Sequence, residues 1–394
     1  MKYWYLLLSL CFGACASHYE GVPEKYHPLL DQAFAKSGSN KEVLKTALEQ
    51  CDSAGKEGMA FLISYMPEHD LQNISAELLK ENVEYAYKAR HTFPWAATVP
   101  DSIFLNEVLP YVSLNETREH WRKDFYERFS KYVVNCQTIF EAIDSVNRNI
   151  RDEVVVDYNT KREKPDQSPS ESIRQGMASC SGLSILLTDA FRAVGIPSRI
   201  AGTPNWHDNR GNHNWCEVWA DGEWYFTEYY PNRLNMAWFL ADAGKADGKD
   251  KQHAIYASSF KPTGISFPLV WDENIEYVPA ENVTDRYVAI YDNYVAAIRS
   301  DGNHVQVKLM MFKDNQCTLN SDDRVEANVD VFCGTEQIGG GRTAGPTKDM
   351  NEVLEFMLEK NKTYTFKYAD AQGANRDVDI QVSDEPQEVR LYMN

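Results

Sequence analysis

Positive charge is scarce in this chain of 394 residues. Lys and Arg together number 40 against 58 Asp and Glu, so the formal net charge is -18 at neutral pH. A protein that binds a phosphate backbone or an anionic lipid surface needs clustered basic residues, and the sequence has no obvious basic patch. The composition therefore argues against nucleic acid as a partner.

Long apolar runs are also missing at the amino terminus, where residues 3–12 form a run too short to span a bilayer. One lysine precedes this run and small residues follow it, which is the layout of an export signal. Residues 14–16 (Ala-Cys-Ala) fit cleavage by a signal peptidase, whereas residues 13–15 (Gly-Ala-Cys) resemble a bacterial lipobox. We favour the lipobox, which makes Cys15 a lipid anchor at the periplasmic or outer cell surface. In the plainer alternative, the cysteines of this segment only fill an apolar signal.

Metal-binding patterns are absent from the sequence. None of the eight cysteines has the CxxC spacing of a zinc site, and calcium loops of the D-x-D-x-D-G type are missing. We therefore expect no metal and no cofactor. Export permits disulfides, and Cys317 with Cys333 is the local pair to consider, although buried free thiols are an equal alternative.

The periodicity of apolar residues changes along the chain. Helical spacing dominates from about Lys25 to Asp152, and a charged, proline-containing stretch over 154–172 indicates a surface connection. From about Thr284 the helical spacing mostly disappears, and short alternating runs predict a β-sandwich. We expect an α+β fold. Its parts are a signal segment (1–16), a helical region (17–135), a catalytic core (136–280) and a sandwich (281–394).

The stretch MASCSGLSILLTDAFRAVG predicts a helix with a cysteine at its start. Its apolar residues recur every three to four positions, and Gly195 ends the helix. Cys180 falls in the opening turn, where unpaired backbone N–H groups and the helix dipole favour a negative charge. That position suits a thiolate. Cys180 also continues the apolar spacing of the helix, so a buried, inert thiol is the alternative.

A β-hairpin is predicted downstream, with its turn at residues 221–222 (Asp-Gly). Counting outward from a two-residue turn places Trp215 opposite Glu228. His213 then lies diagonally beside Glu228 on the same face, while Cys216 points to the other face and should be structural. We expect a hydrogen bond between His213 and Glu228.

These side chains would together supply a nucleophile, a base and an orienting acid. If the first turn of the Cys180 helix abuts the His213 face, an imidazolium next to the sulfur would lower the pKa of the thiol. The backbone N–H of Cys180, with Gln175 as a second donor, could hold a developing oxyanion. Each residue alone has an ordinary structural explanation, but their joint spacing indicates a catalytic site.

The segments GMASCSG, GIPSRIAG and GNHNWCEVWADGEWYFTEYYP, within about sixty residues from Gln175 to Pro231, resemble the transglutaminase-like cysteine enzymes. That resemblance implies a papain-like core in which a Cys at a helix start meets a His and an Asp on successive strands. It makes Cys180 the nucleophile and His213 the base. Glu228 occupies the position where the family usually has Asp, and a longer acid can still orient an imidazole. The resemblance implies acyl transfer from an amide, as in peptidases, deamidases, glycopeptide amidases and cross-linking enzymes, without fixing the acceptor.

Aromatic residues near the histidine indicate a substrate cleft, for which Trp206, His207 and Trp215 are the candidates. Ordinary sheet packing is the alternative for the tryptophans, and a solvated loop is the alternative for His207. The expected partner is a peptide, a protein or another amide substrate, with membrane contact only through the lipid anchor. The rival function is a non-catalytic surface protein that binds glycan or protein through the aromatic cleft or the sandwich.

Overall fold

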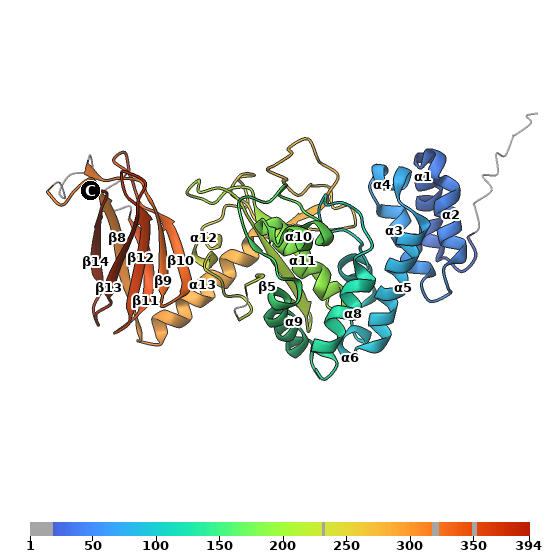
Figure 1. Ribbon diagram of the computed structural model, residues 1–394, viewed down its shortest axis with the longest axis horizontal. Helices are drawn as coiled ribbons and strands as arrows, with labels where there is room; N and C mark the ends of the chain where they lie inside the picture. Colours follow the sequence, from blue (N-terminus) through green and yellow to red (C-terminus); the bar gives the residue numbers. More distant parts are fainter. Residues whose placement is uncertain (1–18, 231–232, 317–322, 349–352) are drawn as a thin grey trace, which may run out of the picture.

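The computed structural model describes residues 19–230, 233–316, 323–348 and 353–394. A helical region, a mixed core and a set of sheets follow one another along the long axis of the molecule (Figure 1). The predicted α+β class, with helices first and sheets last, is confirmed. Cys15 and the rest of the predicted signal lie outside the described residues. Within the described ranges, no helix is both long and apolar enough to cross a membrane.

The helical region forms because apolar residues at helical spacing pack into one cluster, which includes Leu44, Met59 and Leu79. Ser75 caps its longest helix by accepting a hydrogen bond from the backbone N–H of Leu78. The elements are η1 (Glu24–Tyr26), α1 (His27–Lys36), η2 (Gly38–Asn40), α2 (Lys41–Gln50), α3 (Lys56–Tyr65), α4 (Glu68–Asn73), α5 (Ala76–Thr92), α6 (Pro94–Ala97), α7 (Asp101–Ile103) and η3 (Phe104–Val108).

The core combines helices with an antiparallel sheet of five strands in the order β5-β4-β3-β6-β7. Its helices are α8 (Arg122–Val133), α9 (Ile139–Val154), α10 (Pro169–Gln175), α11 (Cys180–Ala193), α12 (Leu240–Ala243) and α13 (Thr284–Ser300). Its strands are β1 (Asp157–Tyr158), β2 (Met177–Ala178), β3 (Ser198–Thr203), β4 (His213–Ala220), β5 (Glu223–Thr227), β6 (Tyr256–Ser258) and β7 (Ala280–Asn282). Helix α11 packs against α8, α9 and the β4 side of the sheet, and these elements share one apolar cluster.

The β4–β5 hairpin has the predicted register. Trp219 lies opposite Trp224, and the turn residues Asp221 and Gly222 have φ angles of 49° and 97°. Two residues with positive φ make the tight turn whose twist matches that of paired strands. The Asp-Gly pair therefore determines which side chains of β4 and β5 share a face.

Two parts of the chain differ from the sequence prediction. The stretch 154–172 is not simply a surface connection, because Gln167 and Ser168 are fully buried. Gln167 donates a hydrogen bond to the carbonyl of Met177, 2.9 Å away, and so supports the segment that leads into α11. The expected loss of helical structure from about Thr284 is also wrong, since α13 spans 17 residues there. Its apolar face is built largely of tyrosines, and no side chain caps its start.

The carboxyl-terminal part forms the predicted two-layer β structure. One sheet has the strand order β10-β9-β12-β13 and the other β11-β8-β14. Val307, Val331 and Phe366 are among the buried residues between them. The strands are β8 (His304–Phe312), β9 (Asn328–Cys333), β10 (Glu336–Arg342), β11 (Leu354–Glu359), β12 (Thr363–Ala369), β13 (Asn375–Gln381) and β14 (Gln387–Tyr392).

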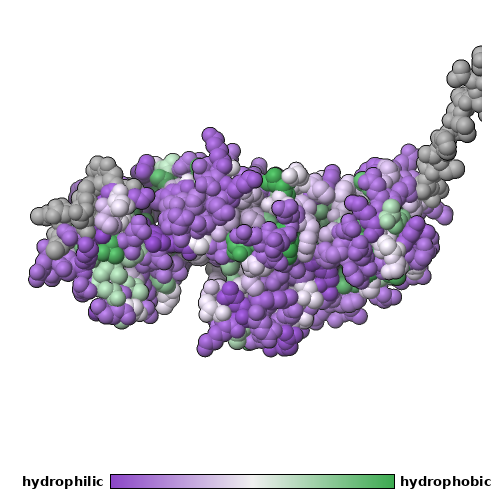
Figure 2. Space-filling model, turned by 90° about the horizontal axis from the view of Figure 1, so that it is seen from above, coloured by the Kyte–Doolittle hydropathy of each residue, from purple (hydrophilic) through white to green (hydrophobic). Residues whose placement is uncertain are grey.

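The sandwich meets the core through β9 and β10, which lie on the side of α12 and α13 (Figure 1). Figure 2 shows a largely hydrophilic surface with small, separate hydrophobic patches, and a recess where the sandwich meets the core. The junction contains charged groups: the backbone N–H of Arg342 donates to Asp208, 3.0 Å away. Arg210 in turn contacts the carboxylates of Asp208 and Asp242 at 2.7 and 2.6 Å.

Candidate active site

Cys180 is the first residue of α11, as the sequence predicted. Ser179 caps the helix by accepting a hydrogen bond from the backbone N–H of Gly182, 3.1 Å away, and its own hydroxyl donates to the carbonyl of Pro165. Every residue of α11 after Cys180 is buried, whereas Cys180 itself is partly exposed. The helix therefore holds its sulfur at an accessible amino-terminal end.

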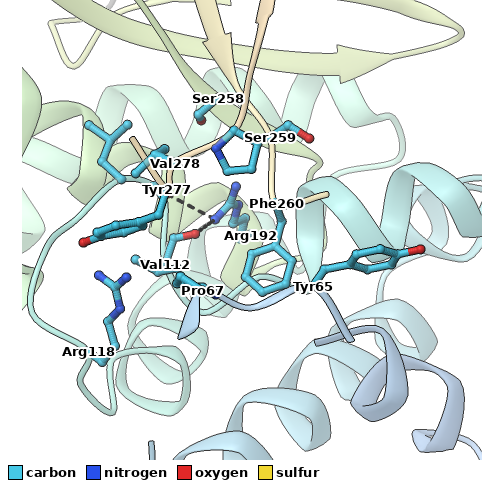
Figure 3. A pocket seen from close by; sticks show the side chains of 13 residues that line it. Tyr65, Pro67, Val112, Arg118, Arg192, Ser258, Ser259, Phe260, Tyr277 and Val278 are labelled. Atoms are coloured by element: carbon cyan, nitrogen blue, oxygen red, sulfur yellow. Dashed lines mark hydrogen bonds between the residues drawn. The ribbon is translucent and has the colours of Figure 1, made fainter. Parts of the chain in front are cut away.

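The opposite end of α11 is fixed by the buried side chain of Arg192. Its guanidinium donates to the carbonyl oxygens of Ser198 (2.9 Å) and Val112 (3.0 Å) and to the hydroxyl of Ser113 (3.1 Å). Figure 3 shows this side chain beside a small cavity of about 30 Å³, which is also lined by residues of the helical region such as Tyr65. These bonds tie α11, which carries Cys180 at its other end, to both the helical region and the sheet.

His213 and Glu228 are hydrogen-bonded, as the hairpin register predicted. Nε2 of His213, the first residue of β4, lies 2.8 Å from Oε1 of Glu228, which follows β5 directly. Asn147 of α9 donates to the backbone carbonyl of Glu228 at 2.7 Å and accepts from the hydroxyl of Thr227 at 2.6 Å. The position of Glu228 is therefore set by the buried side-chain amide of Asn147 as well as by β5.

Sequence reasoning missed Asn147. The only available signal was a polar residue on the apolar face of a strongly amphipathic helix, between Val146 and Ile150. Such a residue must find a hydrogen-bond partner when buried, but nothing in the local pattern shows that the partner is 80 residues away.

The imidazole of His213 and the thiol of Cys180 line the same cavity and interact electrostatically, each shifting the pKa of the other. Because Nε2 faces Glu228, the other ring nitrogen is available to the sulfur. Burial opposes ionisation of the thiol, but the interaction with the His213 imidazole outweighs it and lowers the pKa of Cys180 below its ordinary value. The backbone N–H of Asn214 and the hydroxyl of Ser181 act in the same direction.

The pKa of His213 is shifted in the opposite direction, upward. Burial by itself would lower the pKa of His213, but the contacts with Cys180 and Glu228 raise it to about 9. A thiol with a lowered pKa next to an imidazole with a raised pKa favours a thiolate–imidazolium pair at neutral pH. The arrangement can therefore attack an electrophilic carbon and then donate a proton to a leaving group.

Cys216 provides the internal comparison. It lies on the other face of β4, as predicted, with its sulfur 3.3 Å from the carbonyl oxygen of Ser184 and 3.4 Å from the hydroxyl of Thr188. Burial raises the pKa of its thiol to about 12. The thiol pKa is thus lowered at Cys180 and raised at Cys216, although the two cysteines are close together in the fold. Of these two, only Cys180 is suited to nucleophilic chemistry.

A cavity of about 750 Å³ opens in front of Cys180, His213 and Glu228. The rings of Trp238 and Phe239 pack against the imidazole with centroid distances of 5.1 and 5.3 Å. The core side of the cavity includes Tyr158, Leu183, Trp206, Tyr230 and Trp238. The sandwich supplies Asn328, Asp330, Phe332, Thr335, Glu336 and Gln337.

The three predicted cleft residues have different surroundings. Trp206 and Trp215 line the cavity but are only 4% and 1% exposed, and their stacked rings belong mainly to the core. His207 is not among the residues that line this cavity; its Nε2 lies 3.5 Å from Asp242. The structure thus places Trp206 at the site and His207 at the junction with the sandwich.

Gln175, the predicted second oxyanion donor, is not among the residues that line the cavity in front of Cys180. It ends α10 and accepts a hydrogen bond from the backbone N–H of Glu163 at 3.1 Å. Gly176 has a φ of 63° and turns the chain directly after Gln175. The side chain of Gln175 faces the loop that precedes α10. The amide nitrogen Nε2 of Gln175 is buried without a hydrogen-bond partner among the described residues, so its role as an oxyanion donor stays a prediction, as does that of the backbone N–H of Cys180 at the helix start.

Side chains with metal-ligating atoms meet at the junction with the sandwich. The ligand atoms of His207, Asp208 and Asp242 lie within 4.8 Å of one another. Arg210 already contacts both carboxylates, so its charge occupies the position that a cation would take. Among the described cysteines, Cys51, Cys136, Cys180, Cys216 and Cys333 are free, and Cys317 lies outside the described residues.

Comparison with known proteins finds a family model that matches part of the chain. Residues 127–229 match the model described as "Transglutaminase-like superfamily", a segment that contains Cys180, His213 and Glu228. A comparison with curated proteins found no match.

Two similar solved structures are a "putative cysteine protease" from Cytophaga hutchinsonii and a transglutaminase from red sea bream. The first has 15% identity and a TM-score of 0.28, over 35% of this chain and 45% of that chain. The second has 10% identity and a TM-score of 0.28, over 77% of this chain and 59% of that chain. The match spans about half the length of each of these proteins.

Proposed function

Because residues 127–229 match the model of the transglutaminase-like superfamily, we propose that this protein is a cysteine-dependent enzyme that acts on amides. Cys180 is the nucleophile, His213 the acid and base, and Glu228 the residue that orients the imidazole. The observation that supports this most strongly is the 2.8 Å hydrogen bond between His213 and Glu228 at the cavity that Cys180 also lines.

The reaction begins when the Cys180 thiolate attacks the amide carbonyl carbon. The carbonyl oxygen takes up negative charge, which the backbone N–H of Cys180 at the helix start can stabilise. As the C–N bond breaks, the His213 imidazolium donates its proton to the leaving nitrogen, and a thioester with Cys180 remains. His213 then accepts a proton from the incoming acceptor.

The acceptor determines the class of product. If water attacks the thioester, the products are a carboxylic acid and the free thiolate–imidazolium pair, as in a peptidase or deamidase. If an amine attacks, the products are a new amide and the same resting pair, as in a transferase. We propose hydrolysis or acyl transfer by this one mechanism, with a peptide, a protein or another amide as the substrate.

Alkylation by iodoacetamide, followed residue by residue with mass spectrometry, tests the assignment of Cys180. We expect rapid modification of Cys180 at pH values below the range in which free thiols ionise, and we expect His213→Ala to abolish that reactivity. Cys216 in the same sample is the matched internal control and stays unmodified in the folded protein. Slow modification of Cys180 that does not depend on His213 would favour the rival function of a non-catalytic binding protein.

Activity itself is tested by incubating a peptide library with the protein and with Cys180→Ala, and by measuring released amine or ammonia and newly formed amides. Products that form with the wild type and not with Cys180→Ala support the proposal. Products that form equally with both proteins would contradict it.

We also propose that the amino-terminal segment directs export and that Cys15 carries a lipid. Mass spectrometry of the mature amino terminus tests this. A lipid-modified Cys15 at the first position supports the anchor, and its loss in Cys15→Ser is the control. An unmodified mature protein that begins after Ala16 would indicate signal-peptidase cleavage, and an intact segment would contradict export.

A further inference from the structure

A hydrogen bond joins the two residues that directly follow Cys180 and His213. Ser181 is the second residue of α11, and Asn214 is the second residue of β4. Nδ2 of Asn214 donates to Oγ of Ser181 at 2.8 Å, and the two residues are only 5% and 1% exposed. The bond therefore links the start of the helix to the start of the strand, directly beside the sulfur and the imidazole.

Most of the contact between α11 and β4 is apolar. Val218 and Ala220 share the strand face of Asn214, and they pack in one cluster with Leu186 and Leu187 of the helix. A buried amide and a buried hydroxyl gain little net stability, because each gives up hydrogen bonds to water, but their bond accepts only a narrow range of geometries. This bond therefore contributes to the position of the helix start more than to the stability of the fold.

Gly202 on β3 leaves room for the amide. It is paired with Asn214 in the sheet. A methyl group at position 202 would overlap the side-chain oxygen of Asn214 and would lie 2.8 Å from the carbonyl oxygen of His213. Only glycine leaves this space free, so β3, β4 and α11 together determine where the amide lies.

Both residues of the bond also act on the sulfur. Against the effect of burial, His213 lowers the pKa of the Cys180 thiol, and the backbone N–H of Asn214 and the hydroxyl of Ser181 add to this. A serine hydroxyl carries one proton and can rotate. Because Oγ of Ser181 accepts from the Asn214 amide, its own proton points away from that amide and can stabilise the thiolate next to it.

We propose that Asn214 is a positioning residue of the nucleophile. Its side-chain amide holds Ser181 so that the Ser181 hydroxyl and the Asn214 backbone N–H stay directed at the sulfur of Cys180 throughout the reaction. Neither residue makes or breaks a bond to the substrate, and His213 remains the acid and base. The inference rests on the proposed function, because it concerns the same nucleophile.

A double-mutant cycle with Asn214→Leu, Ser181→Ala and the double variant tests this. The measured quantities are the pH midpoint of iodoacetamide alkylation at Cys180 and the free energy of unfolding in denaturant. Each single variant leaves one buried polar group unpaired and should be less stable than the wild type. The double variant leaves neither group unpaired, so part of the lost stability should return.

We expect the pH midpoint to rise by about one unit in each single variant and to stay equally high in the double variant. A merely structural bond would not give this pattern, in which stability returns and the ionisation of Cys180 does not. The matched control is Ser198→Ala at the other end of β3, which loses a buried hydrogen bond to the carbonyl of Glu217 (2.9 Å). It should lower stability and leave the midpoint unchanged.

The positioning role is wrong if Asn214→Leu and Ser181→Ala keep the wild-type midpoint, or if Ser198→Ala raises it equally. Asn214→Ala, which removes the amide without adding bulk, replaces Asn214→Leu if that variant does not fold. An unchanged midpoint, with the reactivity of Cys180 still dependent on His213, would overturn this inference alone. If instead the midpoint shifts as expected while that reactivity does not depend on His213, the proposed catalytic function fails and the link between Asn214 and the sulfur remains.

Discussion

Replacing Glu228 with Gln separates the role of the acid from that of the histidine. Gln keeps the size of the side chain and removes its charge. The contacts with Cys180 and Glu228 raise the pKa of His213 from an ordinary 6.5 to about 9, which corresponds to roughly 3 kcal/mol of stabilisation of the imidazolium. The hydrogen bond and charge of Glu228 supply part of this.

Loss of Glu228 removes part of this stabilisation and shifts the equilibrium from the thiolate–imidazolium pair toward the neutral pair, by about tenfold for every 1.4 kcal/mol removed. The alkylation rate of Cys180 at neutral pH should therefore fall by up to about tenfold in Glu228→Gln. Well above pH 9 the thiol is ionised in both proteins, so the two rates should converge. In turnover the alkaline limb, which reports loss of the imidazolium proton, should move from about 9 toward neutral pH.

The assay is the rate of iodoacetamide alkylation at Cys180 across a pH series. Glu223→Gln is the matched control, because Glu223 is an exposed carboxylate at the far end of β5 and its loss should change nothing. Equal rates for Glu228→Gln and wild type at neutral pH would refute the orienting and charge-stabilising role of Glu228. A rate deficit that persists undiminished at high pH would instead indicate a distorted site.

Three further predictions concern the support of the site. Asn147→Ala should lower the free energy of unfolding by about 1–3 kcal/mol, because the backbone carbonyl of Glu228 loses its buried donor. The same change should slow alkylation of Cys180. Thermal unfolding measures the first effect and the alkylation assay the second. Cys216→Ala should leave the alkylation of Cys180 unchanged, whereas a parallel loss of reactivity would show that the two thiols are coupled. Arg210→Ala should lower the free energy of unfolding by roughly 3 kcal/mol, because the buried carboxylate of Asp242 loses its guanidinium partner and keeps only His207 nearby. It should also make the junction with the sandwich sensitive to limited proteolysis, and an unchanged digestion pattern would contradict this.

The parts of the site that were predictable from sequence depend on short-range rules. The Asp-Gly pair at 221–222 specifies a two-residue turn, and the alternation of strand side chains then brings His213 to Glu228. The apolar residues at helical spacing before Gly195 predict α11, and Cys180 is its first residue.

The parts that were missed depend on contacts between distant segments. Asn147 meets Glu228 only because α9 packs beside the end of β5, and residues of β9 and β10 reach the cavity only because the sandwich docks on the core. Helix α13 was missed for a local reason, since a tyrosine-rich apolar face without a capping side chain resembles a strand-forming sequence. The segment boundaries at 135 and 280 stay predictions.

The central claim is that Cys180 rests as a thiolate paired with the His213 imidazolium. The direct measurement is the ultraviolet absorbance of the thiolate as a function of pH, taken as the difference between the wild type and Cys180→Ala. The account predicts that the difference signal is already present at neutral pH, below the range in which an ordinary cysteine ionises, and that it is lost in His213→Ala. A signal that develops only at or above the ordinary cysteine range, or that is the same without His213, would contradict it.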